Sequence, residues 1–140
     1  MALLHATCVC FQNKGILIMG DSGSGKSDLA LRIIDAGGIL VSDDYVEVDE
    51  VDGNIVATTA PNIEGMIEVR GVGLINVDYQ KRTDIDLVIN LVPLKEIDRL
   101  PEEKFYSHNN ATIPMYDFYG FEVSAFAKLK VILNGLDLNE

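Results

Sequence analysis

The sequence predicts an α/β fold in a single domain, residues 1–140, with a mixed, partly antiparallel sheet and few helices. Three observations support this prediction. Short apolar runs such as residues 85–92 have the length of buried strands. Residues 27–36 carry apolar side chains at helical spacing instead. The turn residues Asp52, Gly53 and Asn54 separate two strand-like segments, which is typical of a β-hairpin.

Glycines mark several of the boundaries between these elements. Lys14 and Gly15 indicate a turn between the first two strands, and Gly37 with Gly38 ends the first helix as a C-cap. In chain order we expect strands at 3–11 and 16–19, a helix at 27–36, strands at 39–41, 45–49 and 55–58, a loop at 61–65, a strand-like segment at 67–77 interrupted by Gly71 and Gly73, a strand at 85–92, a polar helix or loop at 97–104, a hairpin from 113–116 and 121–124, and a helix at 125–133.

The pattern G-x-x-x-x-G-K-[ST] lies between a predicted strand and a predicted helix, the context that a phosphate-binding loop requires. Its glycines let backbone N–H groups approach phosphate oxygens, and the following helix directs its positive end at the same anion. An exposed Lys26 would reach the β- and γ-phosphates, and Ser27 would offer a hydroxyl to Mg²⁺. A chance glycine-rich turn before Lys-Ser is the alternative, which the strand–helix context disfavours. We therefore expect the phosphates of a nucleoside triphosphate to bind to Gly20, Asp21, Ser22, Gly23, Ser24, Gly25, Lys26 and Ser27.

Two adjacent carboxylates, Asp43 and Asp44, end the apolar strand that follows the first helix. In a βαβ unit that strand would lie beside the phosphate-loop strand, with its carboxyl end facing the phosphates. The pair could then divide metal coordination and proton abstraction between them, although a solvated Asp-Asp turn is the alternative. Glu68 and Arg70 share one strand face. They either lie beside the site or form an exposed cross-strand salt bridge.

Composition excludes several classes of partner. The formal net charge of −11 argues against a nucleic-acid partner, because binding a phosphate backbone needs a basic face. No apolar run reaches the ~20 residues of a membrane helix, so we expect no membrane partner. The negative net charge fits a cytoplasmic enzyme, and we expect that location. Cys8 and Cys10 are the only cysteines, and two positions apart on one strand they cannot easily bridge each other.

Together these motifs resemble the catalytic domain of the bacterial HPr kinase/phosphorylase family. The loop at 20–27 is similar to the phosphate loop of that family, and residues 40–44 (L-V-S-D-D) are similar to its Asp-Asp motif. Residues 67–77 (I-E-V-R-G-V-G-L-I-N-V) resemble its signature region, which is far more specific than the loop alone. His5 matches a family histidine, and residues 98–100 (D-R-L) resemble a further short motif. The resemblance runs from about residue 4 to residue 100.

The resemblance implies a fold similar to that of HPr kinase and phosphoenolpyruvate carboxykinase. It also implies a homo-oligomeric protein-serine kinase that uses ATP and Mg²⁺ to phosphorylate the phosphocarrier protein HPr of the phosphotransferase system. By the same resemblance, Asp44 is the base toward the substrate serine, and Asp43 and His5 support it. The implied metal-binding residues are Ser27, Glu68 and Asp43, and the residues that stabilise the transferring phosphoryl group are Lys26 and Arg99.

Three departures from the family pattern modify this expectation. No segment matches the usual N-terminal domain, the Gly-Ala-rich loop is shortened to residues 78–83, and residues 113–120 do not contain the Arg-Pro-Gly-Arg segment associated with dephosphorylation. We therefore expect a short form in which the kinase reaction dominates and phosphorylase activity is weak or absent.

Two other functions are alternatives to this one. A small-metabolite kinase usually needs arginines in a late lid, and no arginine follows Arg99. The second alternative is a non-catalytic regulatory protein that binds ATP. A GTPase is excluded because Asn13-Lys14 is followed by Gly15-Ile16 and not by the base-reading Asn-Lys-x-Asp motif. Four aromatic residues are close together in the sequence: Tyr116, Phe118, Tyr119 and Phe121. We interpret them as a cluster that packs on the sheet, and the alternative is a contact surface for another protomer or for the substrate protein.

Overall fold

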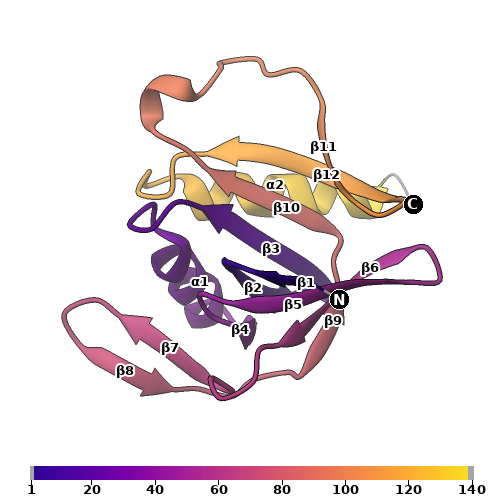
Figure 1. Cartoon of the computed structure of the whole chain (residues 1–140). Coiled ribbons are helices and arrows are strands. Elements are labelled where there is room, and N and C mark those ends of the chain that lie inside the picture. The colour runs from indigo at the N-terminus through magenta and orange to yellow at the C-terminus, as the bar shows by residue number, and fades with distance from the viewer. Residues whose placement is uncertain (1, 139–140) are drawn as a thin grey trace.

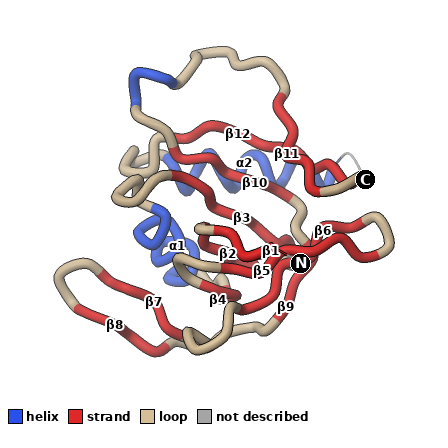
Figure 2. Tube along the Cα trace, in the orientation of Figure 1, coloured by secondary structure: helices blue, strands red, loops and turns tan. Residues whose placement is uncertain are grey.

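The computed structural model describes residues 2–138 and shows a mixed α/β fold built mostly of strands, as Figures 1 and 2 show. The elements are β1 (Ala2–Leu4), β2 (Ala6–Phe11), β3 (Lys14–Gly20), α1 (Lys26–Asp35), β4 (Ile39–Ser42), β5 (Val46–Val51), β6 (Asn54–Thr59), β7 (Met66–Val69), β8 (Gly73–Asn76), β9 (Arg82–Asp84), β10 (Leu87–Leu91), the 3-10 helix η1 (Leu94–Glu96), β11 (Lys104–His108), β12 (Ala111–Phe118) and α2 (Ala125–Leu138).

A six-stranded sheet in the order β11-β12-β10-β3-β2-β4 forms the centre of the molecule. β10 runs parallel to β3 and to β12, whereas β2 is antiparallel to both β3 and β4. The sheet is therefore mixed, as the sequence predicted. Because β3, β4 and β10 share one direction, their carboxyl ends meet at one edge of the sheet, where ligands of α/β proteins commonly bind.

The core has three layers. Both α-helices pack on one face of the central sheet, where alternate residues of β3, Ile16 and Ile18, contact Leu29 of α1 and Leu129 of α2 in one cluster. Leu17, which points to the opposite face, packs instead against the four-stranded sheet β1-β5-β6-β9. The hairpin β7–β8 is a separate two-stranded sheet that projects beside α1 and β4 (Figure 1).

The predicted strand at 3–11 is divided at His5 into β1 and β2. β1 pairs with β5 in the smaller sheet, whereas β2 pairs with β3 in the central sheet. The turn predicted at Lys14 and Gly15 lies two residues earlier, at Gln12 and Asn13, which both have positive φ values (53° and 63°). The strand-like segment at 67–77 is a hairpin whose turn contains Gly71.

Two predictions about strand pairing were wrong. The strand after the first helix, β4, does not lie beside β3, because β2 lies between them. The hairpin predicted from residues 113–116 and 121–124 does not form either. β12 takes β10 and β11 as its partners, and residues 119–124 form the turn that leads into α2. Residues 97–103 form a loop, which is one of the two alternatives predicted for residues 97–104.

Both cysteines are free thiols, and burial is the main reason that the pKa of the Cys8 thiol is raised. Neither α-helix of residues 2–138 is long and apolar enough to cross a membrane.

Candidate active site

The predicted phosphate loop connects the carboxyl end of β3 to the first residue of α1. Gly25 precedes the helix with φ 103°, a conformation that glycine adopts without steric cost. Within residues 2–138, the N–H groups of Gly25, Lys26 and Ser27 have no hydrogen-bond acceptor, and all three residues line a cavity. Free donors at a helix N-terminus are suited to an anion, so the loop fits a phosphate group.

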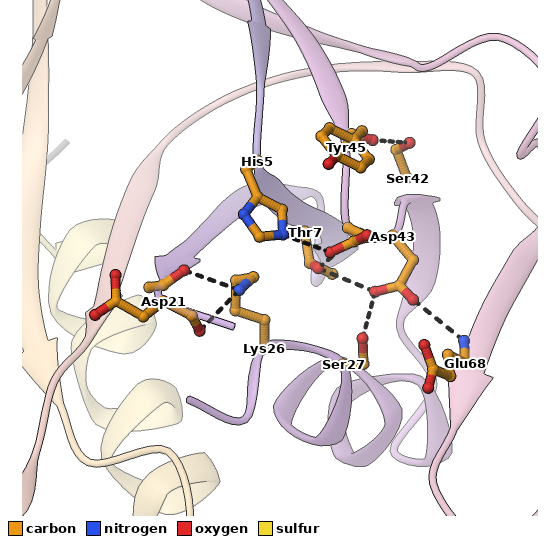
Figure 3. A network of polar contacts seen from close by, with 11 residues as sticks. His5, Thr7, Asp21, Lys26, Ser27, Ser42, Asp43, Tyr45 and Glu68 are labelled. Atoms are coloured by element: carbon orange, nitrogen blue, oxygen red, sulfur yellow. Dashed lines mark hydrogen bonds and ion pairs between the residues drawn. The ribbon is translucent and has the colours of Figure 1, made fainter. Parts of the chain in front are cut away.

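Lys26 is buried, with 6% exposure, whereas the sequence led us to expect an exposed side chain. Its Nζ donates to the carbonyl oxygens of Gly20 at 2.8 Å and Asp21 at 3.1 Å, which hold the ammonium group inside the loop (Figure 3). These partners are neutral, so they satisfy the ammonium group without cancelling its positive charge. A phosphate oxygen could replace either carbonyl.

Asp43 accepts hydrogen bonds from three elements, α1, β2 and β7. Its Oδ1 accepts hydrogen bonds from Ser27 Oγ of α1 at 2.7 Å and from Thr7 Oγ1 of β2 at 3.0 Å (Figure 3). Its Oδ2 accepts from the N–H of Glu68 in β7 at 3.2 Å. The carboxylate is only 5% exposed, and these three donors compensate for its burial.

Asp44 is exposed and lies in a different environment. Its φ of 70° is uncommon for a residue with a side chain, and such conformations occur often at functional sites. His5 Nε2 donates to Asp44 Oδ1 at 2.7 Å, and the Asp44 N–H donates to Thr7 Oγ1 at 3.1 Å. The His5 ring in turn stacks on Tyr45, with 5.1 Å between the ring centroids.

The two acids therefore differ in what they can do. Asp43 is buried against the Ser27 hydroxyl. From this position it could coordinate a metal ion or orient Ser27 as a metal ligand. Asp44 keeps one carboxylate oxygen that has no hydrogen-bond donor within residues 2–138. That oxygen could accept a proton from an incoming hydroxyl group.

The phosphate loop and the exposed acid share one open cavity of about 450 Å³. Most of the predicted site residues line it, but Gly20, Asp21 and Ser24 of the loop do not. Asp43 lies just behind the cavity wall, and Arg99 lies in the exposed segment between η1 and β11. The cavity is lined by His5, Ser22, Gly23, Gly25, Lys26, Ser27, Asp28, Leu31, Asp44, Tyr45, Glu68, Val69, Arg70 and Phe121.

Two of the site's contacts were not predicted from the sequence. Thr7 joins the two acids through its hydroxyl, and Tyr45 supports His5. The available signal was position: Thr7 is two residues beyond His5 on a strand-like segment, and Tyr45 directly follows Asp44.

A divalent metal would have few protein ligands in this cavity. Residues 2–138 contain no cluster of three or more His, Cys, Asp or Glu side chains that could hold a metal ion. Ser27, Asp43 and Glu68 nevertheless lie together, and Figure 3 shows the Glu68 carboxylate on the side of Ser27. Mg²⁺ is usually held by one or two carboxylates together with substrate phosphates, so this oxygen-rich set fits Mg²⁺ bound with a nucleotide.

Sequence comparisons find a matching family model and several similar proteins. A family model described as the HPr Serine kinase C-terminal domain matches residues 1–133. The HPr kinase/phosphorylase of Lachnoclostridium phytofermentans is 42% identical over 114 residues, which cover 74% of this chain and 37% of that protein. The HPr kinase/phosphorylase of Lactobacillus acidophilus is 40% identical over 108 residues, covering 69% and 34% respectively. The chain thus matches about a third of the length of these relatives.

A solved structure has the same fold. The structure of the Hpr(Ser) kinase/phosphatase from Coxiella burnetii superposes with a TM-score of 0.86 at 22% sequence identity, and the match covers 100% of both chains. The arrangement of strands and helices is therefore one already seen in a solved protein.

Proposed function

The chain belongs to the family of HPr serine kinase C-terminal domains, and from this premise we propose that it is an ATP- and Mg²⁺-dependent serine kinase of an HPr-type phosphocarrier protein. One observation carries the proposal. A continuous hydrogen-bond network connects the phosphate loop, through Ser27, Asp43 and Thr7, to the exposed Asp44–His5 pair. A phosphate-binding group and a candidate base are thereby held on one cavity, the arrangement that phosphoryl transfer requires.

The phosphates of ATP bind to the N–H groups at the start of α1, and Lys26 turns from the loop carbonyls to the β- and γ-phosphates. Ser27 and Glu68 would hold Mg²⁺, and Asp43, which accepts a hydrogen bond from the Ser27 hydroxyl, would orient that hydroxyl group toward it. When bound, Mg²⁺ neutralises charge on the β- and γ-phosphates. Lys26 stabilises the charge that develops as the bond to the leaving ADP breaks.

Asp44 accepts the proton of the substrate serine as the serine oxygen forms its bond to the γ-phosphorus. The Asp44 oxygen that His5 does not contact receives this proton, while His5 holds the carboxylate in position. The products are ADP and phosphoserine. The contribution of Arg99 stays a prediction, because it lies outside the cavity in the structure.

The direct test incubates the purified protein with ATP, Mg²⁺ and HPr and maps any phosphorylated residue by mass spectrometry. We expect transfer to a serine of HPr and none to a variant that lacks that serine. ATP binding without transfer to any phosphocarrier would instead support a regulatory ATP-binding protein. Transfer to a sugar or nucleoside would support a small-metabolite kinase. The cytoplasmic location and the homo-oligomeric state stay predictions.

We expect the reverse reaction, attack of inorganic phosphate on phosphoserine-HPr, to be at least about tenfold slower than the forward kinase. Lys26 and Arg70 are the cations on the cavity wall, and they are opposed there by Asp28, Asp44 and Glu68. Holding two anions together in such a site costs roughly 1 to 4 kcal/mol.

The measurement is release of pyrophosphate from phosphoserine-HPr with millimolar phosphate and no ADP. A rate equal to that of the forward kinase would contradict this prediction. Arg70→Ala would then be the first variant to examine, because Arg70 is a cation on the wall of this cavity.

A further inference from the structure

We propose that Phe121 is the stacking platform for the nucleobase of ATP, so that the base lies over the turn between β12 and α2. This inference rests on the proposed function, because it assumes that the phosphate loop holds a nucleoside triphosphate. It adds a base-binding residue from a part of the chain whose aromatic side chains the sequence assigned to packing on the sheet.

The order of the central sheet separates the two sides of the site. β2 and β4 lie on one side of β3 and bring His5, Thr7 and Asp43 to the phosphate loop. β10 and β12 lie on the other side of β3, and the turn of residues 119–124 follows β12 (Figure 1). The phosphate loop thus lies between the acidic pair and this turn.

The chemistry of transfer then decides where the base goes. The attacking and leaving oxygens of a phosphoryl transfer lie roughly in line, on opposite sides of the phosphorus. If Asp44 activates the attacking hydroxyl group, ADP leaves in the direction away from Asp44. The base is the far end of the ADP molecule, so it is directed to the side of the phosphate loop that carries Phe121.

The turn packs directly on the phosphate loop. A Cβ atom added to Gly120 would lie 2.5 Å from the carbonyl oxygen of Ser24, so only glycine allows this approach. A Cβ atom added to Gly25 would lie 3.2 Å from the Phe121 ring. Phe121 nevertheless remains 48% exposed and lines the cavity, so part of its ring is free to meet a ligand.

Several contacts hold this ring in place before any ligand binds. Arg32 of α1 donates to the carbonyl oxygens on both sides of Phe121, those of Gly120 and Glu122. The Tyr119 ring meets the Phe121 ring edge-on, with 5.9 Å between the centroids. A fixed aromatic face costs little ordering entropy on binding, and it can stack on any base.

The other six-membered aromatic ring on the cavity wall belongs to Tyr45, which is poorly placed for this role. It stacks on His5 and follows Asp44 directly, so it stands on the side from which the substrate hydroxyl group must arrive. The aliphatic residues of the wall, Leu31 and Val69, offer no ring for stacking.

The test compares ATP with inorganic tripolyphosphate, which carries the phosphates but no base. Phe121→Ala should raise the Kd for ATP about tenfold or more and leave the Kd for tripolyphosphate unchanged. Val123→Ala is the matched control, because Val123 lies in the same turn, is 99% exposed and does not line the cavity. Both constants can be measured by calorimetry without any turnover.

A second variant makes the stacking visible. The chain contains no tryptophan, so Phe121→Trp introduces a single fluorophore at the proposed platform. ATP should quench its emission and tripolyphosphate should not. In Phe105→Trp, at an exposed residue of β11 outside the cavity, neither ligand should change the emission.

The outcomes separate this inference from the proposed function. If the wild-type chain fails to bind ATP, the proposed function fails and this inference fails with it. If ATP binds but Phe121→Ala leaves its Kd unchanged, only the base placement is overturned. The same holds if Phe121→Ala weakens tripolyphosphate equally, which would make the ring a support of the loop. Slower phosphorylation of HPr at an unchanged Kd for ATP would identify a contact with the protein substrate, and it too would overturn the base placement.

Discussion

Replacing Lys26 by alanine will abolish phosphoryl transfer and leave the fold in place. Lys26 supplies the fixed positive charge of the phosphate loop, and its present partners are only the carbonyl oxygens of Gly20 and Asp21. Loss of such a charge removes several kcal/mol of transition-state stabilisation, which corresponds to a fall in turnover of about a thousandfold or more. Asp21 is exposed, so water can replace the ammonium group at that carbonyl.

The measurement is steady-state kinase activity together with the midpoint of thermal unfolding. Because Lys26 is 6% exposed, its aliphatic stem also packs in the protein. Lys26→Met separates the two contributions, since it keeps most of the stem and removes the charge. We expect the same loss of activity with a smaller change in stability. Lys95→Ala, on the exposed η1 helix, should change neither quantity. Near-normal turnover in Lys26→Ala would rule out our assignment of the loop.

The conformation of the loop at residues 20–27 could be predicted because it depends on neighbours in the sequence, whereas its phosphate binding stays a prediction. The strand before it, the glycines and the helix after it all lie within residues 14–35. The pairing of β4 could not be predicted in the same way. A local β-hairpin turn at Gln12 and Asn13 places β2 beside β3, and β2 then occupies the position that a simple βαβ unit would give to β4.

The error in the order of the strands did not displace the acidic pair. β4 is antiparallel to β2, and β2 is antiparallel to β3, so β4 still ends at the same edge as the phosphate loop. The intervening β2 adds Thr7, whose hydrogen bond to Asp43 joins residues that are 36 positions apart in the sequence. His5 and Asp44 are 39 residues apart, and their contact was expected only from the family resemblance.

The turn after β12 shows a second limit of sequence reasoning. Strand propensity suggested a hairpin at residues 121–124, but β12 already has β10 and β11 as partners. With both edges of β12 paired, the chain leaves the sheet, and Phe121 comes to lie over the phosphate loop. Tertiary pairing therefore decided a local structure that propensity alone could not.

Asp44→Asn will reduce phosphoryl transfer by about a hundredfold to ten-thousandfold while changing the Kd for Mg-ATP by less than about threefold. The amide cannot take the proton of the serine hydroxyl, but it has the size of the carboxylate. Asparagine also tolerates the left-handed conformation of residue 44, so the backbone should keep its position.

The matched variant is Asp43→Asn, one residue away and equally conservative. Asp43 accepts from Ser27 Oγ, Thr7 Oγ1 and the Glu68 N–H, so its substitution disturbs the groups expected to hold the metal. We expect it to weaken magnesium-dependent ATP binding as well as turnover.

The two variants are compared by calorimetry with ATP, with and without Mg²⁺, and by single-turnover phosphorylation of HPr. Collapse of magnesium-dependent binding in Asp44→Asn, with binding preserved in Asp43→Asn, would mean that the two aspartates exchange roles. The buried, three-donor environment of Asp43 and the open carboxylate oxygen of Asp44 argue against such an exchange, because a base must reach its substrate, whereas an acid that orients a metal ligand can remain behind the cavity wall.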